Sequence, residues 1–595
     1  MLFFVYGSIC ALISITLAIG KKQKITSGII SFILIGSIAW LLQPTLSLFS
    51  VGAWLCFLIA IIIPIIGNAI AEANEGMDTR IAICVGYLLF MVGFIFISTK
   101  GFIHHNEYKS LIGEQVETEF SAKTMAPVKI EQARKIDEEH ARILASTLVS
   151  ELGSQSEIGD MNLQLVNGDF VIYNYEGERI ELSIKNELYW VTPMVHTDWF
   201  KSNSNGYTHG YVMVSSSNEN KKYFVTALEP KANTIQKTSR MGVPANQAAE
   251  VEKLKLKYLV KGGFFGNYLP RYLSSNGYLS EFLTDYTFEI DDEGRPYWVV
   301  TKYDKTVGFS GGNATGVVLV DAQTGEIKEE TIESAPAWVD RIQPMNFVKA
   351  QLDDYGEYIN GPFNWSGVDR ETTTPGMSIV VGSDNRLYFY TGIQSNGSDV
   401  GSKAFVLVDS RTKEVFRYKV KGIKEDKVVT TLESKVSEKG YQATSPILYN
   451  VKGRPTYFAA LKGNDKTAKM YGFMSLKGGT QVGVGETVKE ALRSYERMLR
   501  NSGSVKSLDD LVNNTTTETK VVNITKESLG KSVYYYMLLD GLPDKEFYMA
   551  SSDSLELKWT KPGDIVSVSY SEGDNINSII LDKFDNKAYS IQNAK

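Results

Sequence analysis

Cysteine is scarce in this sequence and is confined to apolar stretches. The 595 residues include three cysteines, Cys10, Cys56 and Cys84, and each lies in an apolar run near the N-terminus. The polar remainder of the chain has none. This distribution excludes a disulfide framework, a thiolate metal site and a cysteine nucleophile from that remainder.

An excess of positive charge is also lacking. The formal net charge is −6 at pH 7, which argues against a broad nucleic-acid-binding face, because such faces neutralise phosphates with clustered Lys and Arg. A Walker A sequence is absent, and "GGFFGNYLP" (262–270) lacks the strand-to-helix setting of a dinucleotide site. We therefore expect no nucleic-acid partner and no cofactor.

Charged residues are missing from four apolar runs of about 20 residues, the length that crosses a bilayer as a helix. The runs cover residues 2–19, 25–46, 51–70 and 81–99. They predict a four-helix transmembrane bundle within residues 1–100. Transport pathways usually carry ionisable residues inside the spans, so an anchor is favoured over a channel or transporter. Gly28 with Gly36, or Gly86 with Gly93, would let helices approach closely.

Basic residues in the short loops predict the orientation of these helices. "KKQK" (Lys21–Lys24) follows the first run and Arg80 precedes the fourth, whereas the loop between the second and third runs has no Lys or Arg. Basic loops remain in the cytoplasm. The N-terminus and everything after about Thr99 are therefore expected outside the cytoplasm, in an integral membrane protein whose first partner is the lipid bilayer.

A juxtamembrane segment with an amphipathic helix is expected over residues 101–156. In "PVKIEQARKIDEEHARILASTLVSELG" (127–153) apolar residues recur at helical spacing, Pro127 suits the first turn and Gly153 suits the end. His140 lies on the less polar stripe, where a packed histidine is favoured over a ligand.

Residues 157–500 change to short strand-like runs and predict a large α+β, mainly antiparallel region of one or two modules. Turns are expected at Asn167–Gly168 and Glu176–Gly177. Four hairpin units then recur, each with an aromatic strand followed by a β-branched strand. Their strand pairs are 187–195 with 210–216, 295–303 with 315–332, 386–394 with 403–420, and 454–462 with 469–485.

The aromatic strands of these units begin alike, with "GRPYWVV" (294–300), "GRPTYFA" (453–459), "NELYWVT" (186–192) and "NRLYFYT" (385–391). Gly294 and Gly453 would supply tight turns, and Pro296 and Pro455 would start strands where a missing N–H is tolerated. The echo is therefore interpreted as architecture rather than as a site used twice.

Two stretches resemble the PepSY domain, a small extracytoplasmic module. "VLVDAQTGEI" (318–327) is similar to its strand–turn–strand signature, and "VGVGETVKEALRSYERML" (482–499) to a strand that leads into its helix. Residues 109–499 also resemble an uncharacterised family of bacterial multipass membrane proteins, with "DRIQP" (340–344), "SPILYNVKGRPTYFAALK" (445–462) and "VGVGET" (482–487) as hallmarks. The resemblance implies an inhibitory or protein-binding role outside the membrane and brings no catalytic residue.

A polar linker is predicted over residues 501–518, and a small barrel over 519–595. The last stretch contains five strand-like runs with sharp turns, which suits an OB-like β-barrel. In an acidic, extracytoplasmic setting, a structural or protein-binding barrel is favoured over one that binds oligonucleotides or sugars.

Few residues suggest chemistry. "GFSGG" (308–312) matches a nucleophile elbow around Ser310, but a strand-like run follows instead of the required helix, so a glycine-rich hairpin loop is favoured. His196, Asp198 and His209 flank one variable loop and are weak metal or acid–base candidates without a spacing rule. The paired acids of "IDDEG" (290–294) and "QLDDYGEY" (351–358) do not follow EF-hand spacing.

These observations favour a membrane-anchored, extracytoplasmic protein-interaction or scaffold protein of the cell envelope. Its expected partners are other envelope proteins or a second copy. Two alternatives remain open: an accessory subunit of a transport or secretion complex, and an envelope hydrolase that uses His196, Asp198, His209 or Ser310. Whether the protein is an enzyme is left open, and a non-catalytic role is favoured.

Overall fold

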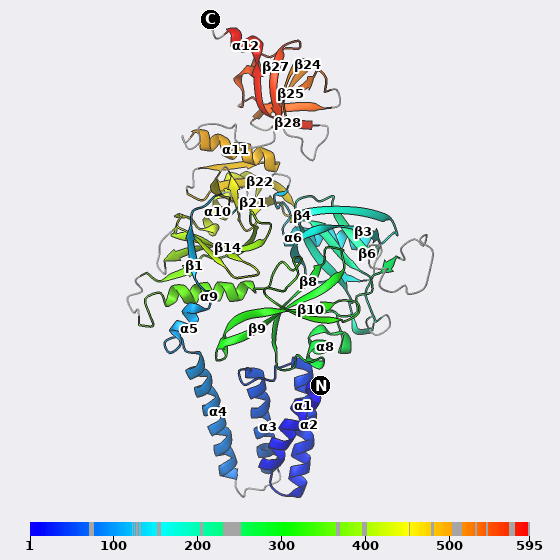
Figure 1. The fold of residues 1–595 in the computed structure, drawn as a ribbon, viewed down its shortest axis with the longest axis vertical. Helices are drawn as coiled ribbons and strands as arrows, with labels where there is room; N and C mark the ends of the chain where they lie inside the picture. The colour runs from blue at the N-terminus through cyan, green and yellow to red at the C-terminus, as the bar shows by residue number, and fades with distance from the viewer. Residues whose placement is uncertain are drawn as a thin grey trace. The chain divides into compact units, whose positions relative to one another are not determined.

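The computed structural model forms two compact units, one of residues 1–128 and 132–498 and the other of residues 129–131 and 499–595 (Figure 1). The structure describes residues 1–70, 77–121, 123, 125, 129, 132–151, 156–200, 202, 206–229, 251–363, 369–395, 401–451, 453–477, 481–501, 515–529, 532–542, 545–551, 553–570 and 578–592. Most of the predicted linker 501–518 therefore lies outside the described residues.

Four apolar helices open the first unit: α1 (Leu2–Leu17), α2 (Lys21–Leu42), α3 (Val51–Ile70) and α4 (Met77–Thr99). Within the described part of the chain, α2, α3 and α4 are long and apolar enough to cross a membrane. Helix α1 is apolar but has only 16 residues. Three candidate spans, α2, α3 and α4, are thus present. A membrane-spanning role for α1, which the predicted four-helix bundle requires, stays a prediction.

Small residues allow α1 and α2 to pack closely, as one of the two predicted glycine pairs requires. A Cβ added at Gly28 would lie 2.8 Å from a side-chain carbon of Ile15, and one at Gly36 would lie 2.9 Å from the carbonyl oxygen of Phe3. For Gly86 and Gly93 on α4, no described atom lies within 4 Å of an added Cβ. Close approach is therefore seen for the first pair and not for the second.

The loop between α2 and α3 faces the β region of the same unit. The backbone N–H of Leu46 donates to the carbonyl of Leu279 at 3.0 Å, and Lys305 Nζ donates to the carbonyl of Phe49 at 3.0 Å. Figure 1 shows that α2 begins, with its lysines, at the end of the helices away from the β strands. The α2–α3 loop, which has no basic residue, and the basic turn that begins α2 thus lie at opposite ends of α2.

The β region contains several sheets, and nearly all of their strand pairs are antiparallel. The first sheet combines β2 (Glu157–Ile158), β3 (Asn162–Asn174), β4 (Arg179–Val195), β5 (Tyr211–Ser215), β6 (Lys222–Glu229) and β7 (Glu252–Lys253). The second combines β8 (Phe282–Ile290), β9 (Pro296–Val307), β10 (Ser310–Asp321) and β11 (Ile327–Thr331) in a meander.

Two further sheets follow. One combines β1 (Gln115–Thr118), β12 (Glu371–Thr373), β13 (Ser378–Val381), β14 (Leu387–Ser395), β16 (Ala404–Asp409) and β17 (Val415–Tyr418), with β15 (Gly401–Ser402) and β18 (Gly422–Ile423) as a separate pair. The other combines β19 (Gln442–Ala443), β20 (Ile447–Val451), β21 (Arg454–Lys462), β22 (Ala468–Ser475) and β23 (Val482–Gly485). Strand β1 pairs with β17 in parallel.

The strand pairs of the four predicted hairpin units are present. Strand β4 pairs with β5, β9 with β10, β14 with β16, and β21 with β22, all antiparallel. The first residue of each aromatic segment has a positive φ: Asn186 (51°), Gly294 (80°), Asn385 (57°) and Gly453 (73°). Glycine and asparagine are the residues that adopt this conformation at least cost, which explains why they alternate at this position.

The Asp-x-x-Thr turns of the two middle units are also alike in detail. Asp321 Oδ1 accepts backbone hydrogen bonds from Gln323 and Thr324 at 2.8 Å each. Asp409 Oδ1 accepts the equivalent bonds from Arg411 and Thr412, also at 2.8 Å. Short acidic side chains that bond their own turn in this way fix its shape, so these aspartates have a structural role.

Helices that the sequence did not reveal pack on the sheets. They are α8 (Leu269–Ser275), α9 (Met345–Glu357) and α10 (Glu425–Lys435). The short helix α5 (His105–Ser110) contacts α9. Leu269 and Leu273 join the core of the first two sheets, and Val348 and Leu352 join that of the third. The helix that the resemblance of "VGVGETVKEALRSYERML" (482–499) implies is present as α11 (Val488–Asn501).

Two local predictions need correction. The described part of the amphipathic helix predicted over 127–153 is α6 (Glu138–Glu151), and residues 134–137 before it are not helical. Asp137 Oδ1 accepts the N–H of His140 at 3.1 Å, as an N-cap does. Pro127 and Gly153 lie outside the described residues. His140 is buried as expected. The turn predicted at Asn167–Gly168 is instead a bulge within β3, where the pairing register shifts between Val166 and Gly168.

The second unit contains a closed barrel in the order β24–β25–β26–β28–β27. Its strands are β24 (Thr515–Leu529), β25 (Ser532–Leu539), β26 (Glu546–Ala550), β27 (Ile565–Tyr570) and β28 (Ser578–Asn586). Buried side chains such as Phe547, Val568 and Leu581 fill it. The five predicted strand runs are therefore strands, and the OB-like assignment stays a prediction.

Candidate functional site

The hairpin between β9 and β10 is a direct contact between the β region and the apolar helices. Val307 pairs with Ser310, so Gly308 and Phe309 form the tip. A Cβ added at Gly308 (φ +53°) would lie 2.5 Å from the carbonyl oxygen of Ser98 at the end of α4. Only glycine fits such a close approach to the α4 backbone, which fixes the hairpin tip against α4.

Aromatic rings complete this contact. The ring centroid of Phe309 lies 5.8 Å from that of Phe49 in the α2–α3 loop and 5.7 Å from that of Phe94 on α4. Both pairs are edge-to-face, an arrangement that aromatic quadrupoles favour. The tip of the hairpin thus packs between α4 and the α2–α3 loop.

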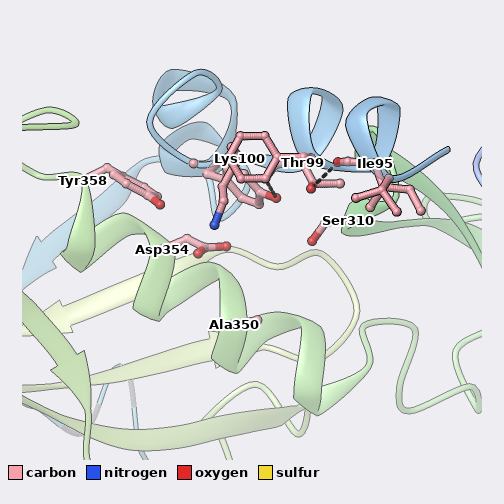
Figure 2. Close-up of a pocket in the computed structure, with 11 residues that line it drawn as sticks. Ile95, Thr99, Lys100, Ser310, Ala350, Asp354 and Tyr358 are labelled. Carbon is pink, nitrogen blue, oxygen red and sulfur yellow. Dashed lines mark hydrogen bonds between the residues drawn. The ribbon is translucent and has the colours of Figure 1, made fainter. Parts of the chain in front are cut away.

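A pocket of about 740 Å³ lies beside this hairpin, where α4 leaves the predicted membrane region (Figure 2). Helix α4 and the residues after it, α5, the start of β10, and α9 line it. The lining residues are Val92, Ile95, Phe96, Thr99, Lys100, Gly101, Tyr108, Ser310, Ala350, Asp354 and Tyr358. The pocket falls within the 300–1,000 Å³ range typical of small-ligand sites.

Asp354 is the acidic group of the pocket. Burial, together with the charges of Asp353 and Glu357, raises the pKa of its carboxyl to about 6. Figure 2 shows this carboxyl below the ammonium end of Lys100, on the same side of the pocket. The site therefore presents a carboxyl that is mainly ionised at neutral pH next to a cationic side chain.

Hydroxyl groups line the rest of the polar side. Tyr108 donates a hydrogen bond to the carbonyl of Thr99 at 2.7 Å. Burial raises the pKa of Tyr108, and its hydrogen bond with Ser310 opposes that rise. Gly101 is required beside Tyr358, because an added Cβ would lie 1.7 Å from the tyrosine oxygen. These contacts fix the end of α4 against α5 and α9.

Ser310 lies in this pocket, but it does not stand on the strand-to-helix turn of a nucleophile elbow. It begins strand β10 after a two-residue turn, which confirms the predicted glycine-rich hairpin. A nucleophilic serine needs a neighbouring base, most often histidine. The described residues that line the pocket include a lysine, an aspartate and two tyrosines, but no histidine.

The three weak metal or acid–base candidates lie around the loop between β4 and β5. The N–H of Met194 donates to the carbonyl of Gly210 at 3.1 Å, so the two ends of the loop are adjacent. His196 is buried, and burial lowers its pKa while Asp198 opposes that effect. The exposed His209 packs against the ring of Tyr207. Among the described residues, no group of three or more His, Cys, Asp or Glu could hold a metal ion.

The two groups of paired acids have different surroundings. Asp291 Oδ1 accepts the backbone N–H groups of Glu293 and Arg295 at 2.9 Å each, so "IDDEG" forms the expected turn. In "QLDDYGEY" the acids lie on α9, where Asp353 accepts the N–H of Thr373 at 2.7 Å and Asp354 faces the pocket. Only one acid of this second group thus contributes to the candidate site.

A second group of acids is buried between sheets and was not identified from the sequence as a cluster. Asp340, within "DRIQP", accepts the N–H of Leu165 at 2.5 Å, and its own N–H donates to Glu289 Oε2 at 3.3 Å. Burial raises the pKa of Glu289 to about 7, and burial together with Glu289 raises that of Asp340. This network links β3, β8 and the segment before α9, which is a structural role.

Sequence patterns could have identified part of the pocket. Lys100 is the first charged residue after the fourth apolar run, a position typical of the membrane interface. Tyr108 and Tyr358 carry no such signal, because each is one of 32 tyrosines. No protein-family model matches the chain, and the search of curated proteins returns no match.

Proposed function

We propose that this protein is a membrane-anchored scaffold of the cell envelope, whose β region binds other envelope proteins or a second copy on the outer side of the membrane. The observation that carries the proposal is the hairpin contact of Gly308 and Phe309 with α4 and the α2–α3 loop. A β region fixed in this way presents its loops at a constant position above the bilayer, which a scaffold requires.

The position of the basic residues supports the proposed orientation. The α2–α3 loop, which has no Lys or Arg, contacts the β region. Lys21–Lys24 begin α2 at the other end of the helix. Positively charged loops stay in the cytoplasm, so the β region and the N-terminus are proposed to lie outside.

Local structure supports the proposed PepSY-like and OB-like assignments. "VLVDAQTGEI" spans the end of β10, its aspartate turn and the start of β11, and "VGVGETVKEALRSYERML" spans β23 and most of α11. The five strands of the second unit close into a barrel, as OB-folds do. Both assignments fit binding modules, and a protein ligand is proposed for each.

Photo-crosslinking in cells tests this proposal. A photoreactive phenylalanine at Tyr175 or at Asn464, both in exposed turns between β strands, reports on neighbours of the β region. The same substitution at Leu89, which is 67% exposed on the apolar surface of α4, is the matched control. We expect one defined protein adduct from the β sites that the control does not give.

The absence of any protein adduct from both β sites, in folded protein at its native level, would contradict the scaffold role. An adduct with a transport or secretion component would assign the protein to that complex as an accessory subunit. An adduct with a second copy would identify self-association as the interaction.

A further inference from the structure

The pocket at the end of α4 is lined by both apolar and charged side chains. Val92, Ile95 and Phe96 supply an apolar wall from α4. Lys100 after the end of α4 and Asp354 on α9 supply charged groups, together with hydroxyl groups, and the Lys100 ammonium lies 5.1 Å from the centroid of the Phe96 ring. A ligand that fills such a pocket has an apolar part and a charged polar part.

The apolar wall lies on a part of α4 that carries other exposed apolar side chains. Leu89, Phe90, Val92 and Ile97 are 67%, 60%, 56% and 62% exposed, respectively. If α4 spans the bilayer, these side chains contact acyl chains, and Lys100 follows the span at the depth of the headgroups. The pocket therefore opens toward lipid hydrocarbon on one side and headgroups on the other.

The charges of the pocket match a particular headgroup. A phosphate carries the negative charge that Lys100 attracts, and a neighbouring ammonium carries the positive charge that Asp354 attracts. Other cations near α9 are already paired, because Lys349 lies 3.2 Å from Asp353 and Arg370 lies 3.1 Å from Glu357. Asp354 is instead directed into the pocket, as Figure 2 shows.

We propose that this pocket binds one phospholipid with a primary amine in its headgroup, its phosphate at Lys100, its ammonium at Asp354 and its acyl chains along α4. The lipid would fill the junction between α4, α5 and α9 and secure the β region on the bilayer. The proposal requires α4 to span the membrane, but it does not depend on whether the β region binds a protein partner.

Native mass spectrometry of the full chain released from detergent tests the proposal. The probes are phosphatidylethanolamine, phosphatidylcholine and phosphatidylglycerol with identical acyl chains. We expect the wild type to retain one phosphatidylethanolamine at least fivefold better than either other lipid. Asp354→Asn should remove the preference over phosphatidylcholine, whose methylated ammonium cannot donate hydrogen bonds, and Lys100→Gln should weaken retention of all three.

Control variants separate these effects from general changes in the protein. Asp169→Asn and Lys185→Gln remove the same charges at exposed positions of β3 and β4 and should behave as the wild type. Ala350→Trp fills the pocket without changing a charge and should prevent retention. This third variant tests the site even if a charge variant fails to fold.

Three results would overturn the proposal. The first is equal retention of all three lipids by the wild type. The second is unchanged retention in Asp354→Asn, Lys100→Gln and Ala350→Trp. The third is displacement of the lipid by soluble phosphoethanolamine at an equal concentration, which would make a free phosphate ester, rather than a membrane lipid, the ligand.

Discussion

The buried carboxyl of Glu289 leads to a quantitative prediction about stability and pH. Its side chain is fully buried on β8 and accepts hydrogen bonds from Thr287 Oγ1 at 3.0 Å and from the N–H of Asp340 at 3.3 Å. Burial raises its pKa from 4.5 to about 7, although the nearby Arg341 opposes the rise. The folded protein therefore binds this proton more tightly than the unfolded chain does.

The sign of the effect follows from that difference. The stability contributed by the proton is fully present below about pH 4.5 and is lost as the pH rises through about 7. The two pKa values of Glu289 differ by an amount that corresponds to about 3 kcal/mol at pH 8. The pKa of Asp340 is also raised by burial, so its proton acts in the same direction.

Glu289→Gln replaces the carboxyl with a neutral group of the same shape. At pH 8 the variant is expected to be more stable than the wild type by up to about 3 kcal/mol, and at pH 5 the two should differ by less than about 1 kcal/mol. Pulse proteolysis in urea measures the midpoint of unfolding for the full chain in detergent. Midpoints are compared because a chain with two units need not unfold in one step.

Glu176→Gln, at an exposed turn, is the matched control and should not change the midpoint at either pH. A Glu289→Gln variant that is less stable than the wild type at both pH values would refute the reasoning. That result would mean that the carboxylate form is the one that the folded protein stabilises.

Two further predictions concern the hairpins. Phe309→Ala removes one ring contact with α4 and one with the α2–α3 loop, worth about 0.5–1.5 kcal/mol each. It should accelerate amide exchange in residues 43–50, whereas Phe363→Ala, at a residue 67% exposed, should not. Equal amide exchange rates of residues 43–50 in the two variants would contradict the packing of the β9–β10 hairpin against this loop. Gly453→Ala should lower the free energy of unfolding by about 1–2 kcal/mol, because the φ of Gly453 is +73°. Gly294→Ala should lower the free energy of unfolding more, because its Cβ would lie 2.9 Å from the buried ring of Phe170. A urea midpoint that falls further for Gly453→Ala than for Gly294→Ala would contradict this explanation.

The strand pairs were predictable because each carries its signal locally. An aromatic strand preceded by glycine or asparagine, such as those after Gly294 and Asn385, identifies a turn and the strand that follows it. Both residues do adopt positive φ. The three long apolar runs were predictable for the same reason, because composition alone determines whether a helix can span a bilayer.

The helices α9 and α10 were not predicted, because their local signals are weak. Helix α9 begins after Pro344 and α10 begins after Lys424, and neither residue caps its helix with a side-chain hydrogen bond. Each is stabilised mainly by the sheet on which it packs: Val348 joins the core of the third sheet, and Leu432 contacts Gly472 of β22. Such tertiary contacts decide helix formation when propensity does not.

The candidate pocket could not be assembled from the sequence. Ser310 and Asp354 each drew attention through a motif, but as a nucleophile elbow and as an acidic pair. Lys100 and Tyr108 come from separate segments, and only the fold brings all four together. The pairing of a cation and an acid at the end of a span is a property of tertiary structure.

The location of the β region is tested most directly by cysteine labelling in cells. With Cys10, Cys56 and Cys84 replaced by alanine, Asn220→Cys, at an exposed position between β5 and β6, is expected to react with an impermeant maleimide in intact cells. Thr79→Cys, exposed at the start of α4, is expected to react only after permeabilisation. The opposite pattern, with Thr79→Cys labelled in intact cells and Asn220→Cys only after permeabilisation, would place the β region in the cytoplasm and contradict the proposed scaffold of the cell envelope.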